Sequence, residues 1–338
     1  MNASFATALN AANEAAAGQH YPQGALYVVA TPIGNLADIT LRALHVLQLA
    51  DAVACEDTRH THSLLQAYGI EHSAADLLAV HQHNEAQSAQ AVLQRLQAGQ
   101  RVVYVSDAGT PAVSDPGARL VAAVRQAGMP VVPVPGVSSI TTLLSASGAL
   151  SQGESSGFVF IGFLPSKAAE RLAAVQALMH EPRAVLLLEA PHRIEALASA
   201  LAVLGDRQLS IGRELTKQFE EIAQLGAQQF AAWLDERPQR KRGEFTLLLH
   251  PQSEPQPNPG GSATGQRLLE LLMPELPLKT AVRLAAQFSA EPRNALYQAA
   301  LALKQTQVSG SNDSIDSAVL ARRPPRASPQ ADCPGITT

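Results

Sequence analysis

The residues best suited to chemistry lie in one short segment, residues 101–117, which reads RVVYVSDAGTPAVSDPG. Its first six residues are mostly apolar, with β-branched and aromatic side chains, a composition typical of a buried strand. Asp107, Gly109 and Thr110 follow that run directly. Because ligands bind beyond the carboxyl ends of the strands in open α/β sheets, we expect these three residues at a ligand site. A rigid turn shaped by Gly and Pro would account for the same residues without a ligand.

A helix is expected directly after this segment. Asp115 suits the N-cap position and Pro116 suits the first helical position, while Gly128 follows the last apolar residues of the helical pattern. The strand and the helix would therefore hold Asp107 and its neighbours between them.

The surrounding sequence alternates between strand and helix patterns from residue 25 to residue 150. Strands are predicted at 25–30, 51–55, 77–80, 101–106 and 131–134, which indicates a parallel sheet covered by helices on its faces. A Gly/Ser-rich break at 151–157 predicts a domain boundary. Beyond it the predicted strands are 158–164, 183–189, 209–214, 219–225 and 243–250, and two of them follow each other without a helix. An antiparallel pair, and so a mixed sheet, is expected in this second domain.

The sequence thus divides into segments of different character. Residues 1–24 are predicted to be a flexible extension, 25–150 the first α/β domain and 157–250 the second. Residues 251–265 are a Pro/Gln/Ser/Gly linker, 266–304 a helical region that resembles a helix-turn-helix, and 305–338 a polar tail predicted to be disordered.

Composition excludes several classes of protein. The 338 residues carry a net charge of −4, so nucleic acid could be bound only through local basic patches. No apolar run is long enough for a membrane span, and the two cysteines are far apart, which favours a cytoplasmic protein without a membrane or a disulfide framework. Neither a P-loop nor a G-x-G-x-x-G fingerprint is present.

Two close histidine pairs could suggest a metal site. His60 with His62, and His81 with His83, could be combined with Glu56 and Asp57 as a set of ligands. Polar loop residues of this kind more often bind substrate or solvent, so no metal is expected.

A set of motifs in fixed order carries a family resemblance. They are residues 29–38 (VATPIGNLAD), 56–59 (EDTR), 106–117 (SDAGTPAVSDPG), 135–138 (PGVS), 162–165 (GFLP) and 213–217 (RELTK). Together they closely resemble the ribosomal RNA small subunit methyltransferase I family, which has the tetrapyrrole methylase fold, over residues 25–304. The first loop of tetrapyrrole-methylating relatives typically reads G-x-G-P-G-D, and residues 31–35 depart from that pattern.

The resemblance implies an S-adenosylmethionine-dependent enzyme that methylates the ribose 2′-hydroxyl of a cytidine in the decoding region of 16S ribosomal RNA, in the cytoplasm and as a homodimer. The assembled small ribosomal subunit is the expected substrate. The donor would bind in a cleft between the two α/β domains. Carried over by motif, the donor site comprises Pro32, Gly34, Asp107, Gly109, Thr110, Pro111, Ser114, Pro135, Ser138, Phe163, Leu164, Gly243, Glu244, Phe245 and Thr246.

A ribose hydroxyl is a poor nucleophile until its proton leaves, so a nearby general base is expected. Glu189, Glu214, Lys217 and Asp57 are the candidates, each of which could instead form a salt bridge or contact a phosphate. Lys217 could act as a base only if burial lowered its pKa.

Basic residues could form an RNA surface that positions the substrate through its phosphates. The candidates are Arg59, Arg193, Arg213, Arg240, Lys241, Arg242, Arg283 and Arg293. Two other functions stay open: a methyltransferase of the same fold acting on a tetrapyrrole such as a precorrin or uroporphyrinogen, and a non-enzymatic nucleic-acid-binding protein built on residues 251–304.

Overall fold

Five parallel strands form the first sheet of the structure, a computed structural model that describes residues 5–80, 85–150, 157–252, 263–289 and 292–304. The strands are β1 (Leu26–Val29), β2 (Ala52–Cys55), β3 (Leu77–Ala79), β4 (Val102–Val105) and β5 (Val131–Val134), in the order β3-β2-β4-β1-β5. All residues of β2 and β4 are buried, which explains their continuous apolar sequences. The predicted parallel sheet is confirmed, with β4 at its centre.

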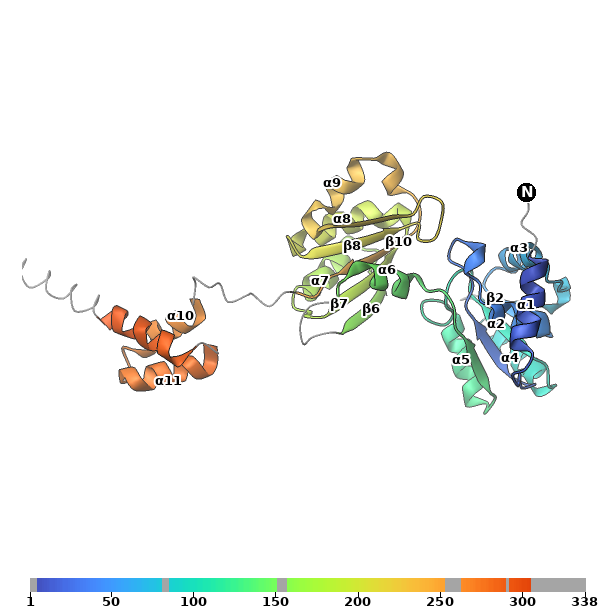
Figure 1. Ribbon diagram of the computed structural model, residues 1–338, viewed down its shortest axis with the longest axis horizontal. Coiled ribbons are helices and arrows are strands. Elements are labelled where there is room, and N and C mark those ends of the chain that lie inside the picture. Colours follow the sequence, from blue (N-terminus) through green and yellow to red (C-terminus); the bar gives the residue numbers. More distant parts are fainter. Residues whose placement is uncertain (1–4, 81–84, 151–156, 253–262, 290–291, 305–338) are drawn as a thin grey trace, which may run out of the picture. The chain divides into compact units, whose positions relative to one another are not determined.

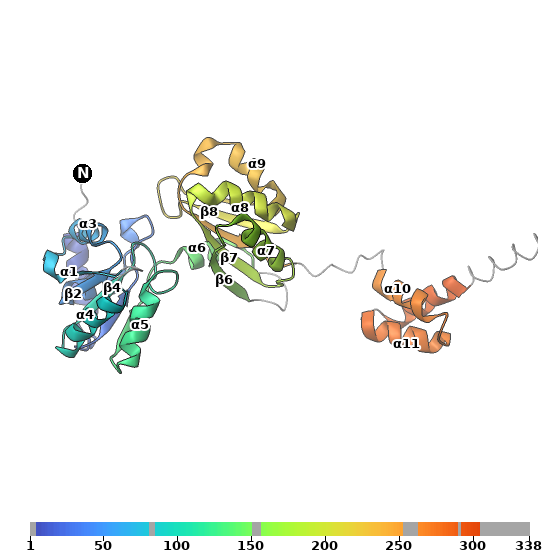
Figure 2. The ribbon, with the colours of Figure 1, turned by 180° about the vertical axis from the view of Figure 1, so that it is seen from behind.

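Helices cover both faces of this sheet (Figures 1 and 2). They are α1 (Ala6–Ala16), α2 (Leu41–Leu49), α3 (Thr58–Tyr68), α4 (Glu85–Gln97) and α5 (Gly117–Gln126). Buried side chains of α1, α2 and α3 share one apolar cluster with the sheet, and those of α4 and α5 share another. The carboxyl ends of the strands stay accessible between these two layers.

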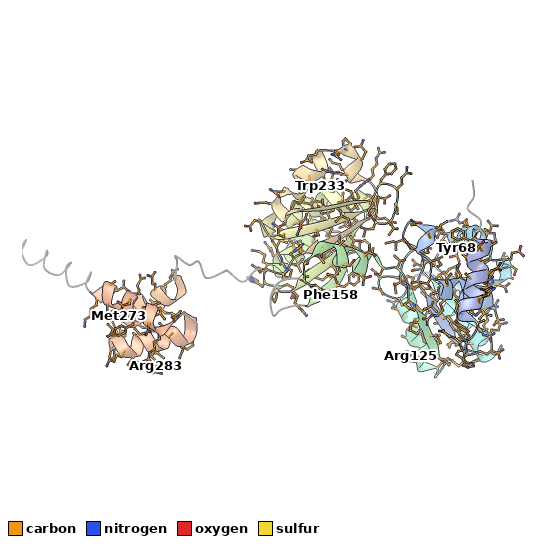
Figure 3. The ribbon with its side chains drawn as sticks, viewed as in Figure 1. Tyr68, Arg125, Phe158, Trp233, Met273 and Arg283 are labelled. Carbon is orange, nitrogen blue, oxygen red and sulfur yellow. The ribbon has the colours of Figure 1, made fainter. Side chains whose placement is uncertain are left out.

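The prediction of a flexible extension over residues 1–24 is wrong for α1. Ala12 and Ala16 are buried, and the Phe5 ring meets the Tyr68 ring edge-on at 4.9 Å between centroids. Tyr68 is labelled in Figure 3. Alanine has the highest helix propensity, and its small side chain allows α1 to lie close against α2. The Ala-rich composition was therefore a helix signal.

The second sheet is mixed, as predicted. Its strands are β6 (Phe158–Phe163), β7 (Ala184–Glu189), β8 (Gln208–Arg213), β9 (Glu221–Gly226) and β10 (Phe245–Leu249), in the order β6-β7-β10-β8-β9. Strands β6 and β7 are parallel, while the pairs β7–β10, β10–β8 and β8–β9 are antiparallel. This arrangement brings the carboxyl end of β7 beside the amino end of β10, where Glu189 pairs with Phe245.

Helices α7 (Ala168–Leu178), α8 (Ile194–Leu201) and α9 (Phe230–Asp235) cover one face of the second sheet. Trp233 of α9, labelled in Figure 3, belongs to this core. The other face is covered by α6 (Ser139–Ser147), whose Leu143 is fully buried in one cluster with Leu186 and Leu248. Sequence placed residues 139–147 in the first domain, but their packing assigns them to the second.

Short 3-10 turns complete the α/β part of the chain, at Leu36–Asp38, Ala74–Asp76, Pro191–Arg193, Ala202–Leu204, Ala227–Gln229 and Pro238–Lys241. Across the described ranges, no helix combines the length and the apolar character that a membrane span requires.

The C-terminal helices form a separate unit with its own small core. Helix α10 (Ala263–Leu272), helix α11 (Leu278–Ser289) and the helical residues 293–304 surround buried Leu269, Val282 and Leu296. Met273 packs against this core, while Arg283 is exposed (Figure 3). The predicted tail at 305–338 and most of the predicted linker lie outside the described residues.

Candidate active site

Backbone hydrogen bonds join the loops after β1 and β4 at the carboxyl edge of the first sheet. The Thr31 and Gly109 N–H groups each donate to the other residue's carbonyl, at 2.9 and 3.0 Å. Gly109 has φ +80°, a conformation that glycine adopts without strain. The Thr110 hydroxyl donates to the Val137 carbonyl at 2.9 Å, which ties in the loop after β5. These contacts fix three strand-end loops relative to one another.

The loop after β2 joins the same group through two reciprocal contacts. The Asp57 N–H donates to Asp107 Oδ1 at 3.2 Å, and the Asp107 N–H donates to Glu56 Oε1 at 3.4 Å. Asp57 also caps α3 by accepting the Arg59 N–H at 2.8 Å. Asp107 and Glu56 therefore lie side by side at adjacent strand ends.

Asp115 holds the loop between β4 and α5. Its Oδ1 accepts the Tyr104 hydroxyl at 2.9 Å and the Gly117 N–H at 2.8 Å, while Oδ2 accepts the Ala112 N–H at 2.6 Å. Ala112 has φ +64°, which is unfavourable for a side-chain-bearing residue, so this charged hydrogen bond stabilises a strained turn. Pro116, rather than the predicted Asp115, is the N-cap residue, although the Asp115 carboxylate does serve the start of the helix.

A cavity of about 520 Å³ lies between these loops and the second domain. Five of the predicted donor residues line it from the first domain and from the segment that joins the two domains: Asp107, Gly109, Thr110, Ser114 and Ser138. From the second domain it is lined by Phe163, Glu244, Phe245 and Thr246. Residues from motifs far apart in sequence thus meet around one space.

Six predicted donor residues do not line this cavity: Pro32, Gly34, Pro111, Pro135, Leu164 and Gly243. Leu164 belongs to the core of the second domain. Gly34 packs against the second domain, since an added Cβ would lie 2.3 Å from Lys217 Cγ. The neighbouring Asn35 N–H donates to the Thr216 hydroxyl at 3.2 Å. Gly34 therefore permits the two domains to meet at this point.

The charge of the cavity is one-sided. Five carboxyl side chains line it, and the lining residues include neither Lys, Arg nor His. The five are Glu56, Asp107, Asp115, Glu189 and Glu244. Such a site favours a cationic ligand and disfavours phosphate groups.

Glu56 was missed as a site residue by sequence reasoning. It is half-buried, and burial together with the nearby Asp115 and Asp107 carboxylates raises its pKa to about 7. The signal available in sequence was its position directly after a predicted strand, at the edge of the sheet where Asp107 was also expected. That two further carboxylates surround it depends on the three-dimensional loop arrangement.

Glu189, one of the predicted bases, lies on the opposite wall. Its side chain has no exposed surface, and Oε1 accepts the Ala190 N–H at 2.9 Å and lies 3.1 Å from Arg193 Nε. Oε2 is buried without a hydrogen-bond partner. A buried, unpaired carboxylate oxygen at a cavity wall is a place for a donor group of a ligand.

The other three predicted bases lie outside the residues that line the cavity. Lys217 Nζ contacts Glu214 Oε1 at 2.8 Å and Glu244 Oε2 at 3.1 Å. Although burial opposes it, these contacts raise the pKa of Lys217, which is the reverse of what a lysine base needs. Burial likewise disfavours the Glu214 anion, but Lys217 and the Glu244 N–H hold its pKa below the ordinary value. Hydrogen bonds from Arg59 lower the pKa of Asp57, so it too is a weak base.

Two of the predicted RNA-binding arginines are structural. Arg240 is buried, pairs with Glu221 and Glu236 at 2.8 and 2.6 Å, and stacks over the Trp233 ring at 4.2 Å. Arg213 is also buried, and its Nε donates to the Arg242 carbonyl at 2.7 Å. Burial and these partners argue against a contact between RNA and either Arg240 or Arg213.

The remaining predicted RNA-binding residues differ in whether a carboxylate pairs with them and in how exposed they are. Arg193 is bound to Glu189, and Lys241 pairs with Glu195 and Asp235 at 2.6 and 2.8 Å. The exposed cations of the set are Arg59, Arg242, Arg283 and Arg293.

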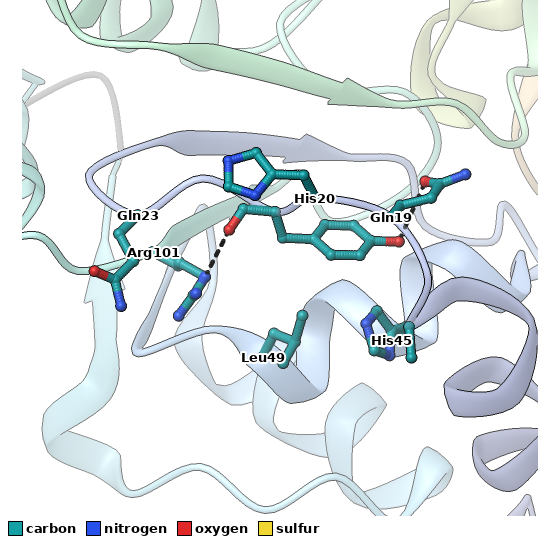
Figure 4. A pocket seen from close by; sticks show the side chains of 8 residues that line it. Gln19, His20, Gln23, His45, Leu49 and Arg101 are labelled. Atoms are coloured by element: carbon teal, nitrogen blue, oxygen red, sulfur yellow. Dashed lines mark hydrogen bonds between the residues drawn. The ribbon is translucent and has the colours of Figure 1, made fainter.

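A second hollow, of about 530 Å³, lies at the opposite edge of the first sheet (Figure 4). It is bordered by Gln19, His20, His45 and Arg101, close to the amino ends of β1 and β4. None of the sequence motifs reaches this hollow, so it is not the candidate active site. Among the described residues, no three His, Cys, Asp or Glu side chains form a group that could hold a metal ion.

Comparison with known proteins agrees with this architecture. The family model described as Tetrapyrrole (Corrin/Porphyrin) Methylases matches residues 25–231, so the chain is of the tetrapyrrole methylase class. A solved cobalt precorrin-4 methyltransferase has a TM-score of 0.50 at 18% identity, covering 68% of this chain and 98% of that one, and shows the fold alone. A second model, the RsmI C-terminal HTH domain, matches residues 259–304.

Curated relatives then define the particular family. A relative from Escherichia coli O157:H7 is 46% identical over 82% of this chain and 95% of its own length, and one from Pseudomonas aeruginosa is 45% identical over 82% and 97%. Both carry the name Ribosomal RNA small subunit methyltransferase I. The chain belongs to the ribosomal RNA small subunit methyltransferase I family.

Proposed function

We propose that this protein transfers a methyl group from S-adenosylmethionine to the ribose 2′-hydroxyl of a cytidine in the decoding region of 16S ribosomal RNA. The names of the relatives supply the class of substrate. The structural observation that carries the proposal is the cavity, whose described lining includes five carboxylates and no basic residue. S-adenosylmethionine has a positive sulfonium and an ammonium group, so its charge complements these residues.

The residues present fit such a donor in further respects. The buried, unpartnered Oε2 of Glu189 can accept a hydrogen bond from an ammonium or hydroxyl group. Phe163 and Phe245 supply apolar surface for an adenine ring, and the Gly109 loop permits close backbone approach. When bound, the donor supplies an activated methyl group, which leaves the protein to orient the acceptor and remove its proton.

The RNA would be held mainly through its phosphates, outside the acidic cavity. Arg59 borders the loop after β2 with its side chain 91% exposed, and Arg242 is exposed in the second domain. Arg283 and Arg293 are exposed on the C-terminal helices. Such contacts position the substrate without reading its sequence and weaken with salt. We propose that the substrate is the assembled small subunit and that the enzyme acts as a homodimer in the cytoplasm.

The experiment that tests this function is methyl transfer from labelled S-adenosylmethionine. Small ribosomal subunits, naked 16S RNA and a uroporphyrinogen substrate are offered in parallel, and nuclease digestion followed by mass spectrometry locates the label. Label on a cytidine ribose in the decoding region is expected. Label on the tetrapyrrole alone, or on an RNA base, would refute the proposal.

A further inference from the structure

The five carboxylates of the cavity differ in how they are held. Asp115 accepts three hydrogen bonds, Glu189 is bound to Arg193, and Glu244 is bound to Lys217. Asp107 Oδ1 accepts the Asp57 N–H. The strongest proton acceptor is the carboxylate with the fewest and weakest such partners, because each partner stabilises the anion and lowers its basicity.

Glu56 is held most weakly of the five, because its one hydrogen bond is longer than the contacts that hold the other four. Its carboxylate accepts one long hydrogen bond, 3.4 Å from the Asp107 N–H, and no ion pair to it is present within the described part of the chain. It stands at the end of β2 next to β4, lines the cavity and is half-buried. A carboxylate in this position can meet a hydroxyl group that enters the cavity.

We propose that Glu56 is the general base for the ribose 2′-hydroxyl, an inference that rests on the proposed function. In the step, the O–H bond breaks and its proton goes to the Glu56 carboxylate. The hydroxyl oxygen forms its new bond to the methyl carbon as the bond between that carbon and sulfur breaks. The electron pair of the broken bond stays on sulfur, which becomes a neutral thioether, and Glu56 later releases its proton to water.

The groups that face Glu56 explain its basicity. Burial and the Asp115 and Asp107 carboxylates raise its pKa to about 7, where a general base is most effective at neutral pH. The other titratable groups nearby are the Tyr104 hydroxyl and the Cys55 thiol, whose pKa values are themselves raised by burial, that of Cys55 to about 11. Both groups are therefore neutral when Glu56 ionises and leave its charge uncompensated.

The test compares Glu56→Gln with Glu189→Gln in the full-length protein. Donor affinity is measured by calorimetry and methyl transfer to small subunits under single-turnover conditions across pH 5.5–9. For Glu56→Gln we expect the rate of methyl transfer to fall at least about a hundredfold, since general bases contribute 10²–10⁴-fold. Donor affinity should fall much less, by under about tenfold, because four other carboxyl side chains still line the cavity. For Glu189→Gln we expect weaker donor binding. A second variant, Glu56→Asp, keeps a carboxylate and should retain more activity than the glutamine variant.

A readout independent of turnover accompanies the rates. In the protein alone, the ¹³C resonance of the Glu56 carboxyl, assigned by its loss in Glu56→Gln, should titrate with a midpoint near 7. The acid limb of the wild-type rate should lie at or below that midpoint, because the bound donor cation favours the Glu56 anion, and it should vanish from the residual activity of Glu56→Gln. A glutamine variant that keeps its rate within about threefold, or keeps the acid limb, overturns the assignment. Failure of the wild type to label a cytidine ribose would instead overturn the proposed function.

Discussion

Replacing Glu56 by glutamine should stabilise the folded protein at alkaline pH. In the fold the pKa of Glu56 is about 7, against 4.5 for an unperturbed glutamate, so the folded state binds its proton more tightly than the unfolded chain. The stability of the wild type therefore falls as pH rises from about 4.5 to about 7. Glutamine carries no charge and escapes this loss.

The magnitude follows from the size of the shift. A difference of this size corresponds to roughly 3 kcal/mol at 1.36 kcal/mol per pH unit. Because the side chain is only half-buried, solvent screening reduces the expected gain to about 2 kcal/mol at pH 8. At pH 4, where the carboxyl is protonated in both states, the two proteins should unfold with nearly equal free energies.

Urea denaturation followed by circular dichroism at pH 4, 6 and 8 measures this difference. Glu244→Gln is the matched control, because it removes another carboxylate of the cavity whose side chain is 71% exposed. Its effect should stay within about 0.5 kcal/mol at every pH. If the difference between Glu56→Gln and wild type does not grow between pH 4 and pH 8, the electrostatic reasoning about Glu56 is wrong.

Three further predictions concern the loop and the basic residues. Gly117→Ala should lower the free energy of unfolding by about 2 kcal/mol, because the added Cβ would lie 1.9 Å from a ring atom of buried Tyr104. Urea denaturation measures this loss. Gly18→Ala is the control, because a Cβ added there meets no atom within 4 Å. Arg240→Ala should lower the free energy of unfolding by about 2 kcal/mol, measured by thermal denaturation, because it leaves partly buried Glu221 without its partner and removes the guanidinium that stacks on Trp233. Arg242→Ala should leave the melting temperature unchanged but weaken RNA binding and reduce its salt dependence by about one ion; an unchanged salt slope in filter binding would argue against its contact with phosphate.

Much of the fold could be predicted from the sequence because local patterns determine it. The apolar runs of the buried strands and the polar residues after them located both sheets and the edge where the loops gather. The packing of α6 could not be predicted, because an apolar helix face such as that of Leu143 does not specify which of two sheets it covers. The helix α1 was missed because its Ala-rich sequence was judged on how little it could bury.

The site was predictable only at the level of motifs. Residues of the 106–117 motif were expected at the ligand site, and several of them line the cavity. The burial of Arg240 was not predictable, because Glu221, one of its two partners, comes from a separate strand. The role of Glu56 likewise depends on Asp107 and Asp115, which approach it only when β2 and β4 are adjacent.

The acidic lining of the cavity affects which nucleotides can compete with the donor for binding. ATP and GTP share a purine nucleoside with a sulfonium donor, but each carries a chain of negative phosphates. A pocket lined by five carboxylates, with no basic side chain among its described lining residues, repels those phosphates while it attracts the cation. Discrimination of this kind requires no contact with the purine, so ATP and GTP should compete weakly with the donor for this cavity.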